Sequence, residues 1–360
     1  MRPPSPEPAL ATAADLTACR ALLRDGSRTF HAASFLLPRR VREPACALYA
    51  FCRVADDAVD CAGDPASGLA QMRERLLCVY ARRPWANPAD RAFAAIVADR
   101  GIPRALPEAL LEGFAWDVEQ RRYDDLAALE AYAARVAGTV GAMMALLMGV
   151  RDCDTLARAC ELGIAMQLSN IARDVGEDAR AGRLYLPLQW LREAGIDPDA
   201  WLAAPVHSAA LGGVVARLLG AADERYARAA RGVLDLPAAC RPGISAARLL
   251  YAEIGHEVRR RGCDGVTRRA TVAGTRKARV LARSLLAASR VPSGDASPPC
   301  AAARFLVAAA GHGPGCEMRT HAGQSARIAW WNLSARLVRS LDLFERLERR
   351  EMIERASSRG

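Results

Sequence analysis

Apolar residues recur every three or four positions along most of the chain, and the runs end where proline and glycine interrupt them. This spacing is typical of amphipathic helices, whereas the alternation that marks strands is scarce. The pattern therefore predicts an all-helical fold, and no repeat period links the helices. The expected helices are residues 15–25, 39–61, 67–81, 88–99, 106–120, 126–149, 153–178, 187–194, 208–231, 242–261 and 274–289.

Both ends of the chain differ in composition from this helical stretch. Residues 1–17 are rich in proline and lack the apolar run of a signal peptide, which indicates a flexible N-terminal segment. Residues 291–300 have the Pro/Gly/Ser composition of a linker. Residues 301–360 join a short alanine-rich run to a long arginine-rich amphipathic pattern. We expect residues 18–290 to form the main domain and residues 301–360 to form a C-terminal helical appendage.

Composition narrows the class of protein. With 360 residues, 51% hydrophobic and 25% charged, the chain is of the soluble globular type. Its longest uncharged stretch, residues 136–150, is too short to span a bilayer and reads as a buried core helix. The net charge is +10, but Lys277 is the only lysine and the arginines are spread among nearly as many acids. This pattern argues against nucleic acid as a partner.

The eleven cysteines are scattered and odd in number, and they form neither a CxxC motif nor a zinc-type pattern. Reduced thiols of this kind fit a cytoplasmic protein.

Two carboxylates stand four residues apart in the helical window PACALYAFCRVADDAVD. Asp56 and Asp60 therefore share one helix face, where like charges repel by about 0.2–0.5 kcal/mol when they are exposed and by more when apolar neighbours bury them. A cation would relieve this repulsion. The alternative is a solvated helix end at which acidic residues simply accumulate.

A second window, MQLSNIARDVGEDARAGRLYLP, repeats this spacing. Asn170, Asp174 and Asp178 follow one another at steps of four, and Gln167 precedes them by three. Two helices with facing stripes of this kind would form an oxygen-lined site suited to Mg²⁺ rather than zinc. Because Mg²⁺ sites are commonly completed by substrate phosphates, the pattern predicts a diphosphate substrate.

The charged residues next to these two acidic stripes can each have more than one role. Arg53 and Arg173 would either neutralise the diphosphate or act as plain ion-pair partners of the acids. Asp57 and Glu177 lie off the two stripes, and Asp57 fits a solvated acid as well as it fits a ligand.

Four segments together resemble a known family. SRTF, LYAFCRVADDAVD, YAARVAGTVG and QLSNIARDVGEDARAGRLYLP resemble the squalene/phytoene synthase family of head-to-head prenyltransferases, and the last segment resembles the bacterial phytoene synthases within it most closely. The resemblance covers residues 20–290, roughly the main domain, and implies an isoprenoid synthase helical bundle that encloses a central cavity. It also implies that the metal ligands are Asp56, Asp60, Asn170, Asp174 and Asp178.

The same resemblance assigns further roles. The implied catalytic residues are Asp56, Asp60, Asp174, Asp178 and Tyr132. The implied substrate-binding residues are Ser27, Tyr49, Arg53, Gln167, Asn170, Arg173, Arg183, Tyr185, Tyr251 and Arg269. Taken without the resemblance, each tyrosine reads as a core aromatic residue whose hydroxyl has a partner. The chain also departs from bacterial relatives at Ala134, where they often carry an aromatic residue.

The reaction implied is the head-to-head condensation of two geranylgeranyl diphosphates through a cyclopropyl diphosphate to phytoene, with release of two diphosphates, in carotenoid biosynthesis. It implies Mg²⁺, with Mn²⁺ as an alternative, and no NADPH. The alternatives are a squalene or hydroxysqualene synthase that uses farnesyl diphosphate, or a non-catalytic prenyl-lipid-binding relative. A non-catalytic relative should have lost acidic residues that this chain retains.

Two further segments, a small-residue helix face and the segment beyond the linker, can each be interpreted in two ways. Gly138, Gly141 and Ala145 form a small-residue helix face against which either another helix or an isoprenoid could pack. Beyond the linker, an apolar stripe that includes Trp330 and Leu337 opposes a basic face. This segment either packs on the main domain or lies on an anionic membrane surface, which would place the protein at the inner face of the membrane as a peripheral contact.

Overall fold

The computed structural model describes residues 11–60, 64–287 and 298–311, and within these ranges it contains helices and no strands. This confirms the all-helical expectation. The longer helices are α1 (Ala13–Gly26), α3 (Arg39–Asp60), α4 (Pro65–Tyr80), α5 (Pro88–Arg100), α6 (Ala105–Val118), α9 (Cys153–Arg180), α12 (Ala209–Asp235), α13 (Arg241–Arg260) and α14 (Gly274–Ala287). The shorter ones are α2 (Arg28–Ser34), α7 (Leu126–Ala133), α8 (Thr139–Leu147), α10 (Leu188–Glu193), α11 (Pro198–Ala203) and α15 (Arg304–Gly311).

Polar side chains fix where most helices begin. Each accepts a hydrogen bond from a first-turn N–H that has no partner inside the helix. The residues that cap helices in this way are Thr12, Ser27, Asp64, Asn87, Asp125, Asp152, Asp197 and Ser208. Proline follows the cap in α4, α5 and α11, where its missing N–H removes no helical hydrogen bond.

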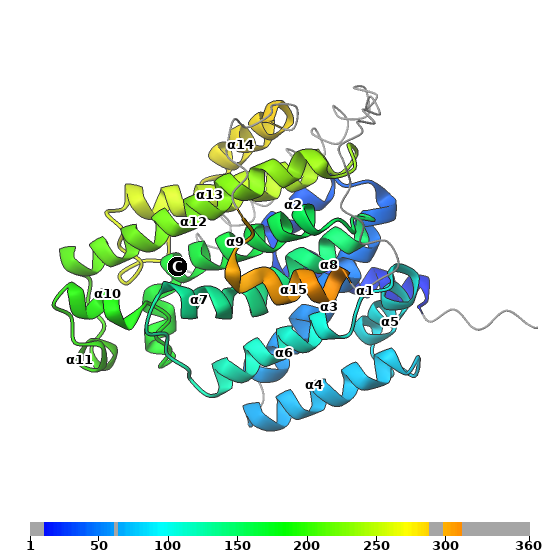
Figure 1. Cartoon of the computed structure of the whole chain (residues 1–360), viewed down its shortest axis with the longest axis horizontal. Coiled ribbons are helices and arrows are strands. Elements are labelled where there is room, and N and C mark those ends of the chain that lie inside the picture. The colour runs from blue at the N-terminus through cyan, green and yellow to red at the C-terminus, as the bar shows by residue number, and fades with distance from the viewer. Residues whose placement is uncertain (1–10, 61–63, 288–297, 312–360) are drawn as a thin grey trace, which may run out of the picture.

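Helix α9 is the central element of the bundle. It contacts α7, α8, α12, α13 and α15, and it runs through the middle of the view in Figure 1. Its buried positions are mostly small or aliphatic, which lets these neighbours approach on several sides. Helices α3, α4, α5 and α6 pack on one another in the lower half of Figure 1. The acidic stripes of α3 and α9 therefore belong to one helical bundle.

The structure differs from the sequence prediction in several places. Residues 13–17, expected in a flexible N-terminal segment, belong to α1, where Asp15 is buried and pairs with Arg91. Helices α2, of seven residues, and α11, of six, were not predicted. The expected helix 126–149 is interrupted by a π-helical turn (Ala134–Gly138), in which the amide of Thr139 donates to the carbonyl oxygen of Ala134. The expected buried core helix is present as α8, in which Met143 and Leu147 are fully buried.

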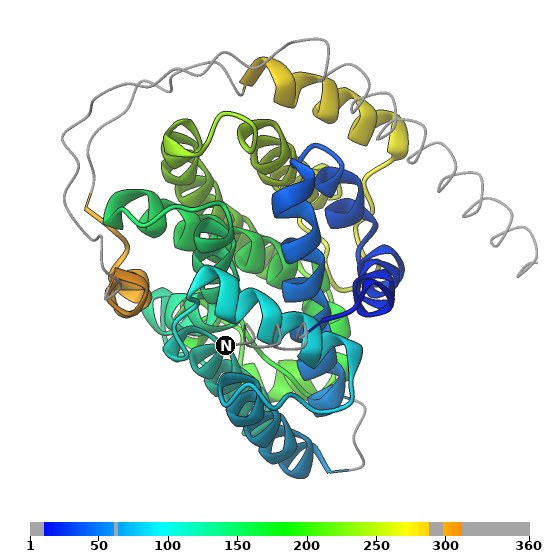
Figure 2. The same ribbon diagram turned by 90° about the vertical axis from the view of Figure 1, so that its right-hand side faces the viewer.

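Residues 300–311 pack on the bundle, although the sequence pattern placed them partly in a linker and partly in a separate appendage. The amide of Cys300 donates to the buried carboxylate of Glu161 at 3.0 Å, and the Cys300 thiol points to Glu130 at 3.6 Å. In α15, Leu306 is fully buried and lies close to Gly138. Figure 2 shows α15 (orange) and α14 (yellow) on different sides of the bundle.

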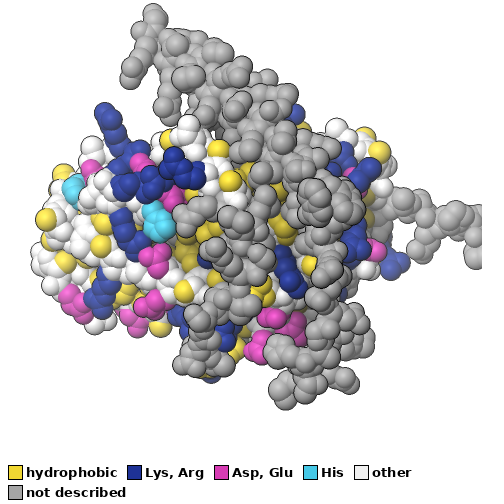
Figure 3. Space-filling view, turned by 90° about the horizontal axis from the view of Figure 1, so that it is seen from above, with side chains coloured by type: hydrophobic (Ala, Val, Ile, Leu, Met, Phe, Trp, Pro, Cys, Tyr) yellow, Lys and Arg dark blue, Asp and Glu magenta, His cyan; other side chains and the backbone are white. Residues whose placement is uncertain are grey.

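No helix among the described residues is long and apolar enough to cross a membrane. The amphipathic segment that contains Trp330 and Leu337 lies outside the described residues, as do residues 1–10. On the face seen in Figure 3, Lys and Arg side chains lie next to Asp and Glu side chains rather than in one large basic patch.

Candidate active site

A cavity of about 340 Å³ opens between α3, α6, α9 and the π-helical turn. Ten of the residues singled out from the sequence line it: Tyr49, Arg53, Asp56, Tyr132, Gln167, Asn170, Asp174, Asp178, Arg183 and Tyr185. They come from four separate parts of the chain, so the fold brings the two acidic stripes to one space. A single cavity lined by residues of both stripes is what the two-helix hypothesis requires.

The wall formed by α3 carries Tyr49, Arg53 and Asp56 at helical spacing. Arg53 forms ion pairs with Asp56 at 3.3 Å and with Asp57 at 2.7 Å. This arginine therefore partly neutralises the acids, and Asp57 is an ion-pair partner. Asp60 is the last residue of α3, and its side chain lies outside the described part of the structure.

The wall formed by α9 carries Gln167, Asn170, Asp174 and Asp178. Asp174 is held by two arginines: Arg173 contacts it at 2.5 and 2.7 Å, and Arg269 contacts it at 2.9 Å. The repulsion expected from the sequence is therefore relieved at Asp174 by cations of the chain itself.

The pKa of Asp178, one turn further along α9, is raised to about 7. Burial is the main cause and the negative charge of Asp174 adds to it, although the positive charge of Arg183 acts to lower the pKa. One turn before Asp174, the side-chain oxygen of Asn170 is buried and has no hydrogen-bond partner among the described residues. An unpartnered amide oxygen that lines the same cavity as a carboxyl group that resists ionisation fits a site that receives a cation.

The donor set consists of carboxylate and amide oxygens, which suits Mg²⁺ or Mn²⁺. Within residues 11–60, 64–287 and 298–311, no three acidic, histidine or cysteine side chains converge closely enough to hold an ion by themselves. The assignment of Asp56, Asp60, Asn170, Asp174 and Asp178 as ligands remains a prediction.

Sequence reasoning missed Asp117, which connects two of the expected tyrosines. It stands near the end of α6, where it accepts hydrogen bonds from Tyr132 at 2.9 Å and from Tyr185 at 2.7 Å. The two phenol rings stack with centroids 5.2 Å apart. Burial raises the pKa of Tyr132 well above its usual value, and the charge of Asp117 contributes. Both phenols therefore stay protonated and donate to Asp117.

The apolar part of the cavity wall was also missed. It consists of Val59, Leu110, Phe114, Val136 and Ile171, with the half-buried Cys52 beside them. Single aliphatic residues carry no signal in one sequence that separates a cavity wall from ordinary core. The wall provides the apolar surface that a hydrocarbon chain would need.

Ser27, Tyr251, Arg173 and Arg269 lie outside the residues that line the cavity. Ser27 caps α2 and hydrogen-bonds with Tyr251, whose pKa burial raises to about 12. Arg173 and Arg269 reach the site indirectly, through Asp174.

The small-residue face of α8 packs against another helix. A Cβ atom at Gly141 would collide with the carbonyl oxygen of Ala159 on α9. Of the two interpretations left open by the sequence, helix packing therefore holds at this position, and an isoprenoid chain has no room there.

The family model described as squalene/phytoene synthase matches residues 23–277, so the chain belongs to the squalene/phytoene synthase family. Its relatives include the phytoene synthase of Rhodobacter capsulatus, which is 54% identical over 83% of this chain and 91% of that protein. The 15-cis-phytoene synthase of a Paracoccus species is 42% identical over 71% of this chain and 85% of that protein.

A solved structure of a dehydrosqualene synthase in complex with a ligand superimposes with a TM-score of 0.70 at 28% identity. The match covers 76% of this chain and 96% of the other. The fold is therefore the isoprenoid synthase helical bundle, as the resemblance implied.

Proposed function

We propose that this protein is a phytoene synthase that condenses two molecules of geranylgeranyl diphosphate head to head. The observation that carries the proposal is a single cavity with two acidic helix faces and an apolar wall. With Mg²⁺ bound, the acidic faces would hold the diphosphate, and the apolar wall suits the isoprenoid tail. The identity to relatives named phytoene synthase supports the same activity.

The oxygens of Asp56, Asp60, Asn170, Asp174 and Asp178 would hold Mg²⁺, with Mn²⁺ as an alternative. When bound there, the metal ions supply the positive charge that a departing diphosphate requires. Arg53 on α3 and Arg269 beside α9, which pair with Asp56 and Asp174, would neutralise the remaining charge of this group.

The chain's own residues would then guide the two half-reactions. After the first diphosphate leaves, the allylic cation is captured by the double bond of the second substrate, which gives the cyclopropyl diphosphate. That intermediate ionises, rearranges and loses a proton. The carboxylate of Asp117 lies on the cavity wall, where its negative charge would stabilise the cations electrostatically. Phe114 and Val136 would exclude the water that could trap them.

A squalene synthase is the second candidate, and the dehydrosqualene synthase neighbour supports it at the level of the fold. The two functions differ in the length of the substrate and in the need for a reductant. No step of phytoene formation needs hydride, so we propose no NADPH requirement.

Substrate preference tests this proposal. We expect kcat/KM for geranylgeranyl diphosphate to exceed that for farnesyl diphosphate by at least about tenfold, because the longer chain buries an additional isoprene unit against the apolar wall. The measurement is diphosphate release with each substrate in Mg²⁺, with and without NADPH, and reactions that contain EDTA serve as the control. A preference for farnesyl diphosphate together with hydrocarbon formation only in NADPH would favour squalene synthase.

We also propose that this protein is cytoplasmic and binds peripherally to the inner face of the membrane. Phytoene is an insoluble hydrocarbon and has to enter lipid. The basic amphipathic pattern after residue 324 supports this contact.

A further inference from the structure

The loop between α13 and α14 lies against the turn of α9 that carries the acidic stripe. The amide of Gly176, which lies between Asp174 and Asp178 in the sequence, donates to the carbonyl oxygen of Gly265 at 2.9 Å. A Cβ atom at Gly265 would lie 2.6 Å from the carbonyl oxygen of Ala172, so the two backbones meet without room for a side chain. The loop is therefore docked directly on the candidate active site.

Arg269 extends from this loop to the acidic stripe. Its guanidinium contacts Asp174 at 2.9 and 3.1 Å and Glu177 at 3.4 Å. The side chain is 48% exposed, so packing alone does not fix its position. The place of the guanidinium therefore depends on how firmly the backbone of residue 269 is held.

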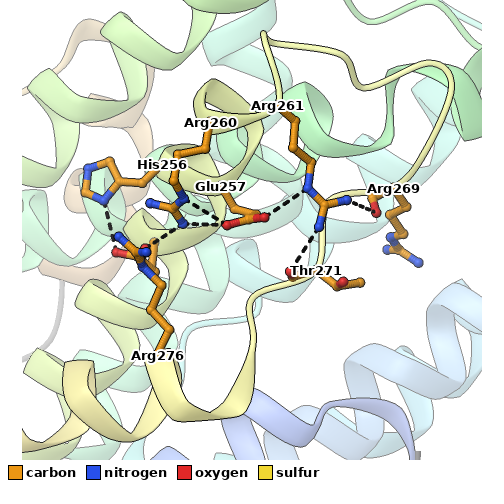
Figure 4. Close-up of polar contacts among 8 residues, drawn as sticks. His256, Glu257, Arg260, Arg261, Arg269, Thr271 and Arg276 are labelled. Atoms are coloured by element: carbon orange, nitrogen blue, oxygen red, sulfur yellow. Dashed lines mark hydrogen bonds and ion pairs between the residues drawn. The ribbon is translucent and has the colours of Figure 1, made fainter. Parts of the chain in front are cut away.

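Arg261, at the C-terminal end of α13, holds that backbone. Its guanidinium donates to the carbonyl oxygens of Arg269 at 3.4 Å and of Thr271 at 3.5 Å, as Figure 4 shows. The same guanidinium is anchored to α13 by Glu257, which accepts from it at 2.9 Å. One planar cation thus joins the helix to two carbonyls of the loop through a rigid fork of donors, whereas a lysine ammonium is a compact point charge on a flexible chain.

The anchor of Arg261 is itself part of a larger network. Glu257 also accepts from Arg260 at 2.6 Å, and Arg260 donates to Glu253 at 2.8 Å. Glu253 in turn pairs with Arg276 in the first turn of α14. The two ends of the loop are therefore tied to each other through side chains of α13 (Figure 4).

We propose that Arg261 is a positioning residue of the active site: it fixes the loop backbone at residue 269, so that the Arg269 guanidinium stays beside Asp174 where a substrate diphosphate would bind. This inference rests on the proposed function, and it concerns binding of the diphosphate rather than the chemical step. Arg261 itself touches neither the cavity nor the acidic stripe.

Arg261→Ala and Arg261→Lys test the proposal. We expect KM for geranylgeranyl diphosphate and the Kd for inorganic diphosphate in Mg²⁺ to rise by about five- to tenfold, the size of one ordinary hydrogen bond, because both carbonyl contacts are long and exposed, with kcat within about twofold of wild type. Amides of residues 265–271 should exchange hydrogen faster. Arg259→Ala is the matched control, since Arg259 pairs with Asp223 at 2.7 Å and has no contact with the loop carbonyls.

The proposal is overturned if both Arg261 variants keep the wild-type KM, Kd and rate of hydrogen exchange in the loop. A loss of kcat at unchanged KM would overturn it as well. If Arg261→Ala does not fold, Arg261→Lys keeps the charge and still removes one of the two carbonyl contacts. If the wild-type protein shows no prenyl transfer at all, the proposed function fails, and hydrogen exchange and diphosphate binding still decide the role of Arg261.

Discussion

Asp174→Asn is expected to reduce turnover by two to three orders of magnitude or more. The change removes one negative charge from the proposed metal site and leaves Arg173 and Arg269 without their shared carboxylate. The loss of one preorganised electrostatic group at a reacting centre commonly costs about 10²–10³ in kcat. The fold should persist, because the asparagine oxygen still accepts hydrogen bonds from the same guanidinium groups.

The measurements are steady-state diphosphate release and the rise in melting temperature that Mg²⁺ and inorganic diphosphate produce together. Both should be lost in Asp174→Asn. The control is Asp154→Asn, an exposed aspartate in the first turn of the same helix, which should behave as wild type. A near wild-type rate of Asp174→Asn at saturating Mg²⁺ would show that the two acidic stripes do not form the metal site.

Asp117→Asn is expected to lower kcat by about 10- to 100-fold. It removes the negative charge to which Tyr132 and Tyr185 both donate, and a buried hydrogen bond to a charged group contributes about 1.5–3 kcal/mol. At about 1.4 kcal/mol per tenfold, that range gives the expected loss. Because the proposed reaction passes through carbocations in the cavity that Asp117 lines, the defect should be in kcat and not in KM.

Single-turnover kinetics with geranylgeranyl diphosphate measure this effect, and Glu119→Gln, an exposed acid two residues away, is the control. Tyr185→Phe removes one donor and keeps the charge, so its defect should be smaller. If Asp117→Asn equals Glu119→Gln, the carboxylate has no electrostatic role in the cavity.

Local signals in the sequence predicted a large part of this architecture. The helices follow from the spacing of apolar residues between proline and glycine, and the structure shows capping residues such as Asp152 and Ser208 at their starts, whose side chains act within three positions of themselves. The acidic stripes follow from the four-residue spacing, which places side chains on one helix face regardless of the rest of the fold. The helices and the acidic stripes both depend on residues only a few positions apart, so a single sequence is enough to predict them.

The partners of those side chains depend on tertiary contacts that no spacing predicts. Asp117 lies 15 residues from Tyr132 and 68 from Tyr185, and in the sequence it resembles a solvated helix end. Arg269 reaches Asp174 across 95 residues. Cys300 meets Glu161 across 139 residues, so its linker-like surroundings concealed a buried contact. Side chains brought together in this way can be identified only when the packing is known.

The most direct test of the account is the identity of the hydrocarbon that the purified protein makes from geranylgeranyl diphosphate and Mg²⁺ without any nicotinamide. The products are extracted and identified by mass spectrometry beside an authentic phytoene standard. The account predicts phytoene as the main product and two diphosphates released for each phytoene. A product that forms only when NADPH is added, or squalene from farnesyl diphosphate as the favoured product, would contradict it.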